Sequence, residues 1–356
     1  MSTRSEYDVV VVGAGIAGAA VFRRLCDAGH SVVLIEEKLV CQGATAFAGG
    51  IVRSFHLEPW LSELALGAIE RFEDSGGLER ARGLFTETGF IRFVRHQDAE
   101  LARAEVRRLQ ARTALEWLEV EAARKRFPYL RLDDCAGAVF EPGAGRIDPW
   151  QACHAWIDAG RRQGGVLMEG VQVSGLVERR TVGFDGVRCS AGEIGGRVVV
   201  LCAGIGTIRL LDGARLPHSL YPKAVQVFQL DARAPANHPS FVDDVLNLNG
   251  GQRSDGSMLL GVPVGPAGHD GSQHRADFGA LPAALERARS RFSWSDRARL
   301  TSAYFAYDTF TSDRPASVRY VDQARTVILA SGFNGGGIKF APAVAERVAD
   351  HVSDRL

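Results

Sequence analysis

The first 35 residues alternate apolar and polar positions in the manner of a strand, a helix and a second strand. Val9–Val12 is a β-branched run suited to a strand buried on both faces. Apolar residues then recur at helical spacing over Ala19–Ala28, and Ser31–Ile35 forms another apolar run. The pattern therefore predicts a β-α-β unit at the start of the chain.

Further elements are predicted along the chain in the same way. Amphipathic spacing predicts helices over Leu61–Glu73 and Ala99–Thr113, and a third that starts at the Asp148–Pro149 turn and ends near Gln163. Strands are predicted in three apolar stretches, Gly89–His96, Val166–Glu169 and Arg197–Gly204.

The pattern changes between about Tyr221 and Tyr307. Strands with alternating apolar and polar residues, such as Ala224–Leu230 and Ser257–Val264, accompany one helix near Leu281–Phe292. This alternation is typical of an antiparallel sheet with one solvated face. A polar, glycine-containing stretch at 266–277 is expected to be a surface loop.

The last segment, Thr326–Val352, returns to a buried strand followed by an apolar helix. It resembles the opening unit more than the sheet before it. We therefore expect one discontinuous nucleotide-binding domain interrupted by a second domain, which suits a chain of 356 residues.

Composition narrows the class of protein. Hydrophobic residues make up 46% and charged residues 24% of the chain, as in soluble globular proteins. Lys plus Arg and Asp plus Glu are equal at 42 each, so no overall field favours nucleic acid. No apolar run is long enough to span a membrane and no signal peptide is evident, so a cytoplasmic protein is expected. Six cysteines without a CxxC pair and histidines without ligand spacing indicate neither disulfides nor a metal site.

The strongest motif is GAGIAG, which lies between the first predicted strand and helix. Gly13 permits a tight turn, Gly15 lets backbone amides approach a pyrophosphate, and Gly18 allows close packing of helix on strand. Glu36 follows the second strand, where it can accept hydrogen bonds from a ribose 2′-hydroxyl. The motif predicts a dinucleotide but leaves FAD and NAD open.

Several segments together resemble one enzyme family. They are, in chain order, the N-terminal unit, GRIDPWQACHAW, GVLMEGVQVSGL, VVLCAG, TSDRP and GFNGGGIKFAP. Their order is similar to that in FAD-dependent amine and amino-acid oxidoreductases, the group of D-amino-acid oxidase, glycine oxidase and monomeric sarcosine oxidase.

The resemblance implies a Rossmann-like FAD-binding domain and a substrate domain with a mixed, largely antiparallel sheet. The FAD-binding domain is expected at 1–86, 146–217 and 312–356, and the substrate domain at 87–145 and 218–311. The implied reaction transfers a hydride from the carbon next to nitrogen to flavin N5. It gives an imine that hydrolyses in water.

The resemblance also implies the residues that bind FAD. A helix starting near Ile338 would direct its amides at the flavin, where reduction develops negative charge. The sarcosine oxidases carry a flavin-linking Cys where this chain has Ala306, so the FAD is expected to be non-covalent. The expected FAD contacts are Gly13, Gly15, Ile16, Ala17, Gly18, Glu36, Glu37, Ala44, Thr45, Gly49, Gly50, Val173, Ala203, Gly204, Gly332, Asn334, Gly335, Gly336, Gly337, Ile338 and Lys339.

Two cations are the expected catalytic residues. Arg53 and Lys339 match basic residues that hold the substrate carboxylate in sarcosine oxidase-like enzymes, and such a pair would fix the substrate against the ring. Asp308 stands where glycine oxidase has a carboxylate-binding Arg, which favours this pair or a substrate with an amine facing Asp308. Tyr221 and Tyr307 are further expected pocket residues.

Leu259 stands where sarcosine oxidases carry a Lys that promotes reaction with oxygen. The electron acceptor, whether oxygen or another carrier, and the oligomeric state therefore stay open. Alternative functions are an NAD-dependent dehydrogenase, an FAD-dependent 2-hydroxy-acid dehydrogenase, a flavin hydroxylase, and a flavin-holding subunit of a heteromeric complex. The first and third share the opening motif but do not predict GFNGGGIK near the end.

Overall fold

The computed structural model describes residues 6–74, 83–179, 182–262 and 275–356, which form two compact units. Unit 1 comprises Met1–Ala48, Asp148–Lys223 and Tyr307–Leu356, and unit 2 comprises Gly49–Ile147 and Ala224–Ala306. Most of the loop expected at 266–277 lies outside the described residues.

The units alternate along the chain in the expected order, but their boundaries differ from the expected ones. The helix α2 (Pro59–Asp74) lies in unit 2, although its residues were expected in the nucleotide-binding domain. The periodicity of this segment predicts a helix, but it carries no information about which sheet the helix accompanies.

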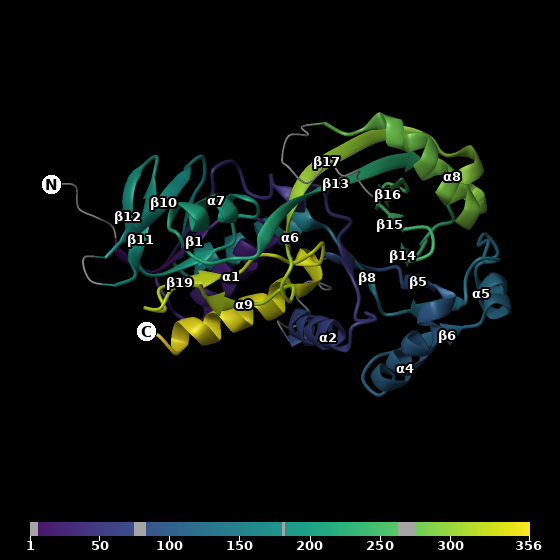
Figure 1. Ribbon diagram of the computed structural model, residues 1–356, viewed down its shortest axis with the longest axis horizontal. Helices are drawn as coiled ribbons and strands as arrows, with labels where there is room; N and C mark the ends of the chain where they lie inside the picture. The colour runs from purple at the N-terminus through teal and green to yellow at the C-terminus, as the bar shows by residue number, and fades with distance from the viewer. Residues whose placement is uncertain (1–5, 75–82, 180–181, 263–274) are drawn as a thin grey trace. The chain divides into compact units, whose positions relative to one another are not determined.

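Unit 1 is built on a sheet whose central strands are parallel (Figure 1). Strand β1 pairs in parallel with β2 on one side and β12 on the other, β9 extends the sheet beyond β2, and β19 pairs in parallel with β12. The strands of this unit are β1 (Glu6–Val12), β2 (Val32–Ile35), β9 (Val166–Met168), β10 (Val173–Glu178), β11 (Phe184–Cys189), β12 (Gly192–Leu201), β18 (Arg319–Tyr320) and β19 (Val327–Leu329). This arrangement confirms the predicted β-α-β unit and the α/β class.

Helices pack against this parallel sheet. Helix α1 contacts both α6 and α9, and Arg24 of α1 binds Glu346 of α9 through two hydrogen bonds of 2.6 and 3.0 Å. Gly160 of α6 allows close packing, because a Cβ there would lie 2.6 Å from the ring of Phe22. The helices are α1 (Ile16–Asp27), α6 (Pro149–Arg162), α7 (Gly206–Gly213) and α9 (Gly337–Ser353), with the short 3-10 helix η1 (Ala44–Phe47).

Unit 2 contains most of an eight-stranded mixed sheet in the order β17-β13-β16-β15-β14-β5-β7-β6. Its pairs are antiparallel at β13–β16, β16–β15, β15–β14, β5–β7 and β7–β6, and parallel at β14–β5, which confirms the mixed, largely antiparallel sheet. The strands are β5 (Phe90–Val94), β6 (Glu116–Leu118), β7 (Gly137–Glu141), β13 (Leu220–Asp231), β14 (Ser240–Asp243), β15 (Leu248–Gln252), β16 (Met258–Val262) and β17 (Arg299–Thr311).

A second, three-stranded sheet in unit 2 has the order β3-β8-β4. Its strands are β3 (Ile51–Val52), β4 (Phe85–Glu87) and β8 (Gly145–Ile147). The remaining elements of the unit are η2 (His96–Asp98), α4 (Ala99–Leu109), α5 (Val120–Arg126), η4 (Phe278–Ala280), α8 (Leu281–Arg291) and η5 (Ser293–Arg297).

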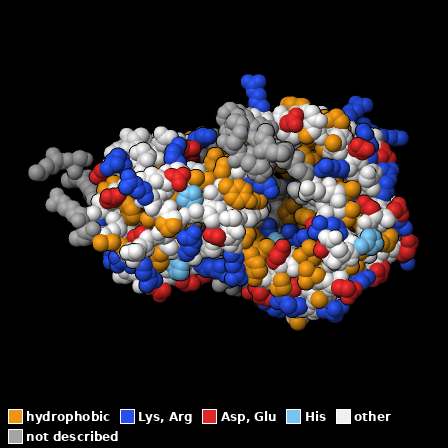
Figure 2. Space-filling view, viewed as in Figure 1, with side chains coloured by type: hydrophobic (Ala, Val, Ile, Leu, Met, Phe, Trp, Pro, Cys, Tyr) orange, Lys and Arg blue, Asp and Glu red, His pale blue; other side chains and the backbone are white. Residues whose placement is uncertain are grey.

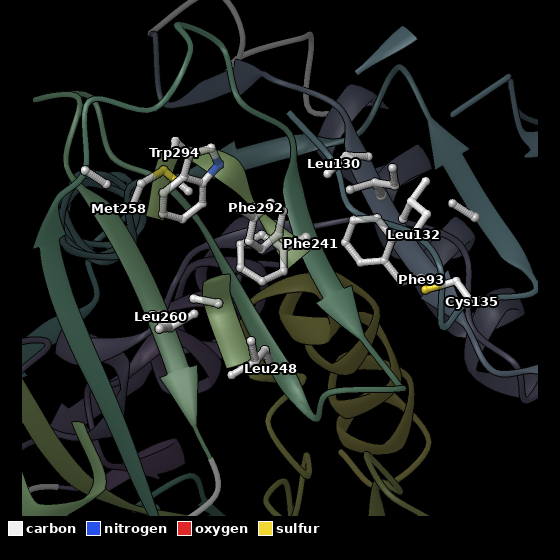
Figure 3. Close-up of a cluster of buried hydrophobic side chains, with 14 of the residues drawn as sticks. Phe93, Leu130, Leu132, Cys135, Phe241, Leu248, Met258, Leu260, Phe292 and Trp294 are labelled. Atoms are coloured by element: carbon white, nitrogen blue, oxygen red, sulfur yellow. The ribbon is translucent and has the colours of Figure 1, made fainter. Parts of the chain in front are cut away.

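Aromatic side chains fill the core of unit 2 (Figure 3). The ring of Phe292 lies 4.7 Å from that of Phe241, 4.9 Å from that of Trp294 and 6.0 Å from that of Phe93, measured between centroids. These spacings are those of favourable aromatic pairs. The large sheet and α8 are therefore joined by apolar packing, since Phe292 directly follows the helix.

His238 is buried in this aromatic core. Its side chain is 1% exposed, its Nδ1 lies 2.7 Å from the carbonyl oxygen of Pro239, and its ring is 4.9 Å from that of Tyr129. Burial lowers the pKa of His238 from 6.5 to about 4. The imidazole is therefore neutral in the folded protein at neutral pH.

We expect the stability of the protein to fall as the pH drops below 6.5. Between the folded pKa of about 4 and the unfolded value of 6.5, the unfolded chain binds a proton that the folded chain does not. The free energy of unfolding should therefore fall by about 2 kcal/mol from pH 7.5 to pH 5, as urea titrations can measure. His238→Phe should lose this part of the pH dependence and the exposed control His96→Gln should keep it; equal slopes in both variants would contradict the assignment.

Candidate active site

The turn between β1 and α1 and the first turn of α1 each require a glycine for close backbone packing. Gly13 has a φ of +98°, and a Cβ there would lie 2.7 Å from Cα of Ala203 at the end of β12. A Cβ at Gly18 would lie 1.8 Å from the carbonyl oxygen of Gly13. The motif thus joins the carboxyl ends of two parallel strands to the first turn of α1. This helix begins at Ile16, three residues before the predicted start.

The N-terminus of α1 offers backbone amides to a ligand. Gly15 precedes the helix with an ordinary φ of −74° and provides no side-chain cap. The Ile16 amide donates to Oγ1 of Thr45 over 3.2 Å, so η1 lies beside this helix end. A helix N-terminus without bulky side chains is suited to a phosphate group.

Glu36 lies just beyond the end of β2, as predicted. Its Oε2 accepts a 2.7 Å hydrogen bond from the Ala14 amide, and its Oε1 accepts one of 2.9 Å from the Lys38 amide. These two amides hold the carboxylate beside the glycine turn.

The GFNGGG turn leads into the second helix N-terminus. Gly332, Asn334 and Gly335 have φ values of +77°, +48° and +79°, a region that favours Gly and tolerates Asn. Asn334 is also held by its side chain, whose Oδ1 accepts from the Thr311 amide over 2.8 Å. Gly336 must lack a side chain, because a Cβ would lie 2.2 Å from the ring of Phe340.

The two helix N-termini are neighbours within unit 1. A Cβ at Gly337, the first residue of α9, would lie 3.7 Å from Cγ2 of Ile16, the first residue of α1. The N-cap residues Gly15 and Gly336 make no side-chain cap hydrogen bond, although Thr45 accepts from the Ile16 amide. Two adjacent N-termini with glycine at the N-cap fit the cofactor that the sequence predicts, with one helix end suited to the pyrophosphate and the other to a ring that becomes negatively charged.

Lys339 is in the first turn of α9. Its side chain is 9% exposed and its Nζ lies 4.8 Å from the centroid of the Phe340 ring. Asp308 of β17 is close by: burial raises its pKa, whereas the amides of Thr309 and Gly335 and the charge of Lys339 oppose this rise. This helix start therefore combines a buried cation with a partly buried carboxylate.

Arg53 is a buried cation in unit 2. Its side chain is 7% exposed, it donates to the carbonyl oxygen of Phe55, and its Cζ lies 4.6 Å from the centroid of the Phe90 ring. Burial, followed by the charge of Arg92, lowers the pKa of Arg53 to about 9, and Glu141, Asp244 and Glu58 oppose this effect. Arg92 makes a bidentate ion pair with Asp244, whereas the ion pairs of the described residues include none for Arg53.

Glu141 supports the Arg53 segment and was not predicted from the sequence. Its side chain is 2% exposed and accepts hydrogen bonds from the amide and hydroxyl of Ser54, at 2.8 and 2.7 Å, and from the Phe55 amide at 3.1 Å. Burial raises the pKa of Glu141, and these donors and Arg53 oppose the rise. The only signal in the sequence is an acidic residue that ends the apolar run of β7.

The other predicted residues are distributed over both units. Val173 lies in the apolar core of unit 1, where its side chain is buried. Leu259 is buried on β16, between two residues of the unit 2 core, Met258 and Leu260, that point to the opposite face of the sheet. Unit 1 holds Ala17, Glu37, Ala44, Thr45, Ala203, Gly204, Tyr221, Ile338 and Tyr307, and unit 2 holds Gly49, Gly50 and Ala306.

Charges are mixed on the visible surface. Figure 2 shows Lys and Arg interspersed with Asp and Glu over the face in view. Over the described ranges, no three or more His, Cys, Asp or Glu residues are grouped so as to hold a metal ion. No helix in the part of the chain that the structure describes is both long and apolar enough to cross a membrane.

Comparison with known proteins identifies the family. The model of the family DAO, FAD dependent oxidoreductase, matches residues 8–351. Monomeric sarcosine oxidase from Streptomyces avermitilis is 26% identical over 97% of this chain and 93% of its own length, and glycine oxidase from Geobacillus kaustophilus is 25% identical over 98% and 93%. The structure of L-proline dehydrogenase from P. horikoshii has the same fold, with a TM-score of 0.88 at 18% identity over 99% of this chain and 94% of that one. The chain therefore belongs to the family of FAD-dependent oxidoreductases.

Proposed function

We propose that the protein oxidises an amino acid or a related primary or secondary amine at the carbon next to nitrogen. The observation that carries this proposal is the junction of the α1 and α9 N-termini, with a buried Lys339 in the first turn of α9. FAD bound there would supply the hydride acceptor. The names of the relatives, sarcosine oxidase and glycine oxidase, support a small amino acid as the substrate.

In this proposal the residues of the turn and Glu36 bind the cofactor. The amides at the start of α1 receive the pyrophosphate, and Glu36 accepts a hydrogen bond from the ribose. The amides at the start of α9 stabilise negative charge on the reduced ring. The bond from the Ala14 amide keeps Glu36 oriented for this role.

Arg53 and Lys339 are the proposed holders of the substrate carboxylate. Arg53 is buried and has no ion pair among those of the described residues, which suits its guanidinium to an anionic ligand. Its planar guanidinium suits a bidentate carboxylate, and Lys339 adds a point charge. Tyr221 and Tyr307 are proposed to line the pocket.

The proposal is tested by anaerobic reduction of the bound flavin. The purified protein should be yellow, and its visible absorption should bleach with at least one member of a panel of D- and L-amino acids and N-methylated amino acids. Bleaching by 2-hydroxy acids alone would favour the hydroxy-acid dehydrogenase. Bleaching by NADH or NADPH alone would favour a flavin hydroxylase. A colourless protein that cannot be reconstituted with FAD would contradict the cofactor assignment.

The FAD is proposed to be non-covalent, because Ala306 cannot form a thioether with the flavin. Acid precipitation of the yellow protein should therefore release all of the flavin into the supernatant. Yellow colour that stays with the precipitated chain would contradict this.

The six cysteines are buried and free of disulfides, which supports a reducing, cytoplasmic compartment.

We expect Leu259→Lys to raise the rate of flavin reoxidation by air about tenfold relative to turnover with an artificial acceptor. A cation near the reduced flavin would stabilise the negative charge that develops as oxygen is reduced. The measurement is the ratio of the two rates, with Leu259→Met as an uncharged control of similar length. An unchanged ratio in the Lys variant would contradict the proposed place of Leu259.

A further inference from the structure

Asp308 is hydrogen-bonded to the glycine turn. Its Oδ2 accepts a 3.1 Å hydrogen bond from the Gly335 amide, and its Oδ1 accepts one of 2.8 Å from the amide of the next residue, Thr309. Both oxygens of the carboxylate are therefore engaged by backbone donors.

The same strand end holds the turn at a second point. The Thr311 amide donates to Oδ1 of Asn334 over 2.8 Å, and Nδ2 of Asn334 donates back to the Thr311 carbonyl over 3.3 Å. Residues 308 and 311 of β17 thus hold residues 334 and 335. Because Gly335 comes two residues before the start of α9, these bonds hold the chain directly before the first turn of α9.

Lys339 lies in that first turn, and its charge acts on Asp308. A buried ammonium group needs a nearby countercharge or hydrogen-bond acceptors to remain charged. Asp308 is partly buried in the same unit and is able to provide that countercharge.

We propose that Asp308 is a positioning residue for Lys339. Asp308 anchors the glycine turn through Gly335 and balances the charge of the lysine. The substrate carboxylate then meets a cation that already has a partner, so binding is weaker than at a lone ammonium group. This inference rests on the proposed role of Lys339 in holding a carboxylate.

Two variants separate the anchoring from the charge. Asp308→Asn keeps an acceptor oxygen for the Gly335 amide but removes the negative charge. Asp308→Ala removes both. Asp350→Asn is the matched control. It removes an exposed carboxylate from α9, the helix of Lys339, far from the N-terminus of that helix.

The probe is acetate, titrated into the FAD-loaded protein and followed by the change in the visible flavin spectrum. We expect Asp308→Asn to bind acetate roughly five- to tenfold more tightly, as when a like charge leaves a partly buried site. Asp308→Ala should bind it at least about tenfold more weakly than Asp308→Asn, because the turn is no longer held. Asp350→Asn should match the wild type.

A double-mutant cycle tests whether Asp308 acts through Lys339. With Lys339→Met in the background, Asp308→Asn should change the acetate affinity less than about twofold. An equal effect of Asp308→Asn in both backgrounds, or identical behaviour of the Asn and Ala variants, would overturn the inference. Unchanged acetate affinity in Lys339→Met alone would instead contradict the proposed role of Lys339.

Discussion

Replacing Lys339 by Met should weaken the binding of a carboxylate substrate by about 1.5 to 3 kcal/mol, the usual contribution of a hydrogen bond to a charged group. Met has a similar length and apolar stem, so it can occupy the same buried position beside Phe340 without the charge. The expected result is a large rise in the substrate concentration needed to reduce the flavin anaerobically. FAD should stay bound, since the helix amides that face it belong to the backbone.

Lys223→Met is a matched control for this variant. Lys223 is also a partly buried lysine of unit 1 whose Nζ lies over an aromatic ring, 4.5 Å from the centroid of Phe310. The Lys223→Met variant should bind substrate with the affinity of the wild type. Wild-type affinity in Lys339→Met would show that the carboxylate is held elsewhere, and equal losses in both variants would point to a general effect of removing a lysine.

Adding a methyl group at Gly15 should reduce the affinity for FAD about 100-fold while the protein still folds. The backbone at Gly15 has an ordinary φ, and a Cβ there would lie 3.1 Å from Oγ1 of Thr45, a contact that a small shift relieves. The methyl group would instead stand where a phosphate must approach the amides of α1. FAD binding is measured by quenching of flavin fluorescence, and folding by the thermal midpoint of the FAD-free protein.

Gly18→Ala should lose both FAD binding and stability. Its Cβ would meet a carbonyl oxygen of the backbone at 1.8 Å, which a side-chain movement cannot relieve, so we expect a loss of stability of several degrees or more in the thermal midpoint. Gly213→Ala is the control, because no atom outside the helix lies within 4 Å of the added Cβ. If Gly15→Ala binds FAD normally, the α1 N-terminus is not the phosphate site.

Local sequence was enough to predict the β-α-β unit at the start of unit 1. The run Val9–Val12, the spacing of Gly13, Gly15 and Gly18 and the place of Glu36 depend on neighbours within about 30 residues, so their pattern is visible along the chain. The helix α1 begins earlier than its apolar spacing predicts, because glycine and alanine in its first turn leave no amphipathic signal.

The support of the candidate site was decided by tertiary structure. Glu141 holds Ser54 from 87 residues away, and Asp308 holds Gly335 from 27 residues away, on different elements. A single acidic residue in a sequence carries no sign of which backbone amide it will accept a bond from. Apolar periodicity shows which face of an element is buried, whereas only the packed structure determines which polar groups meet there.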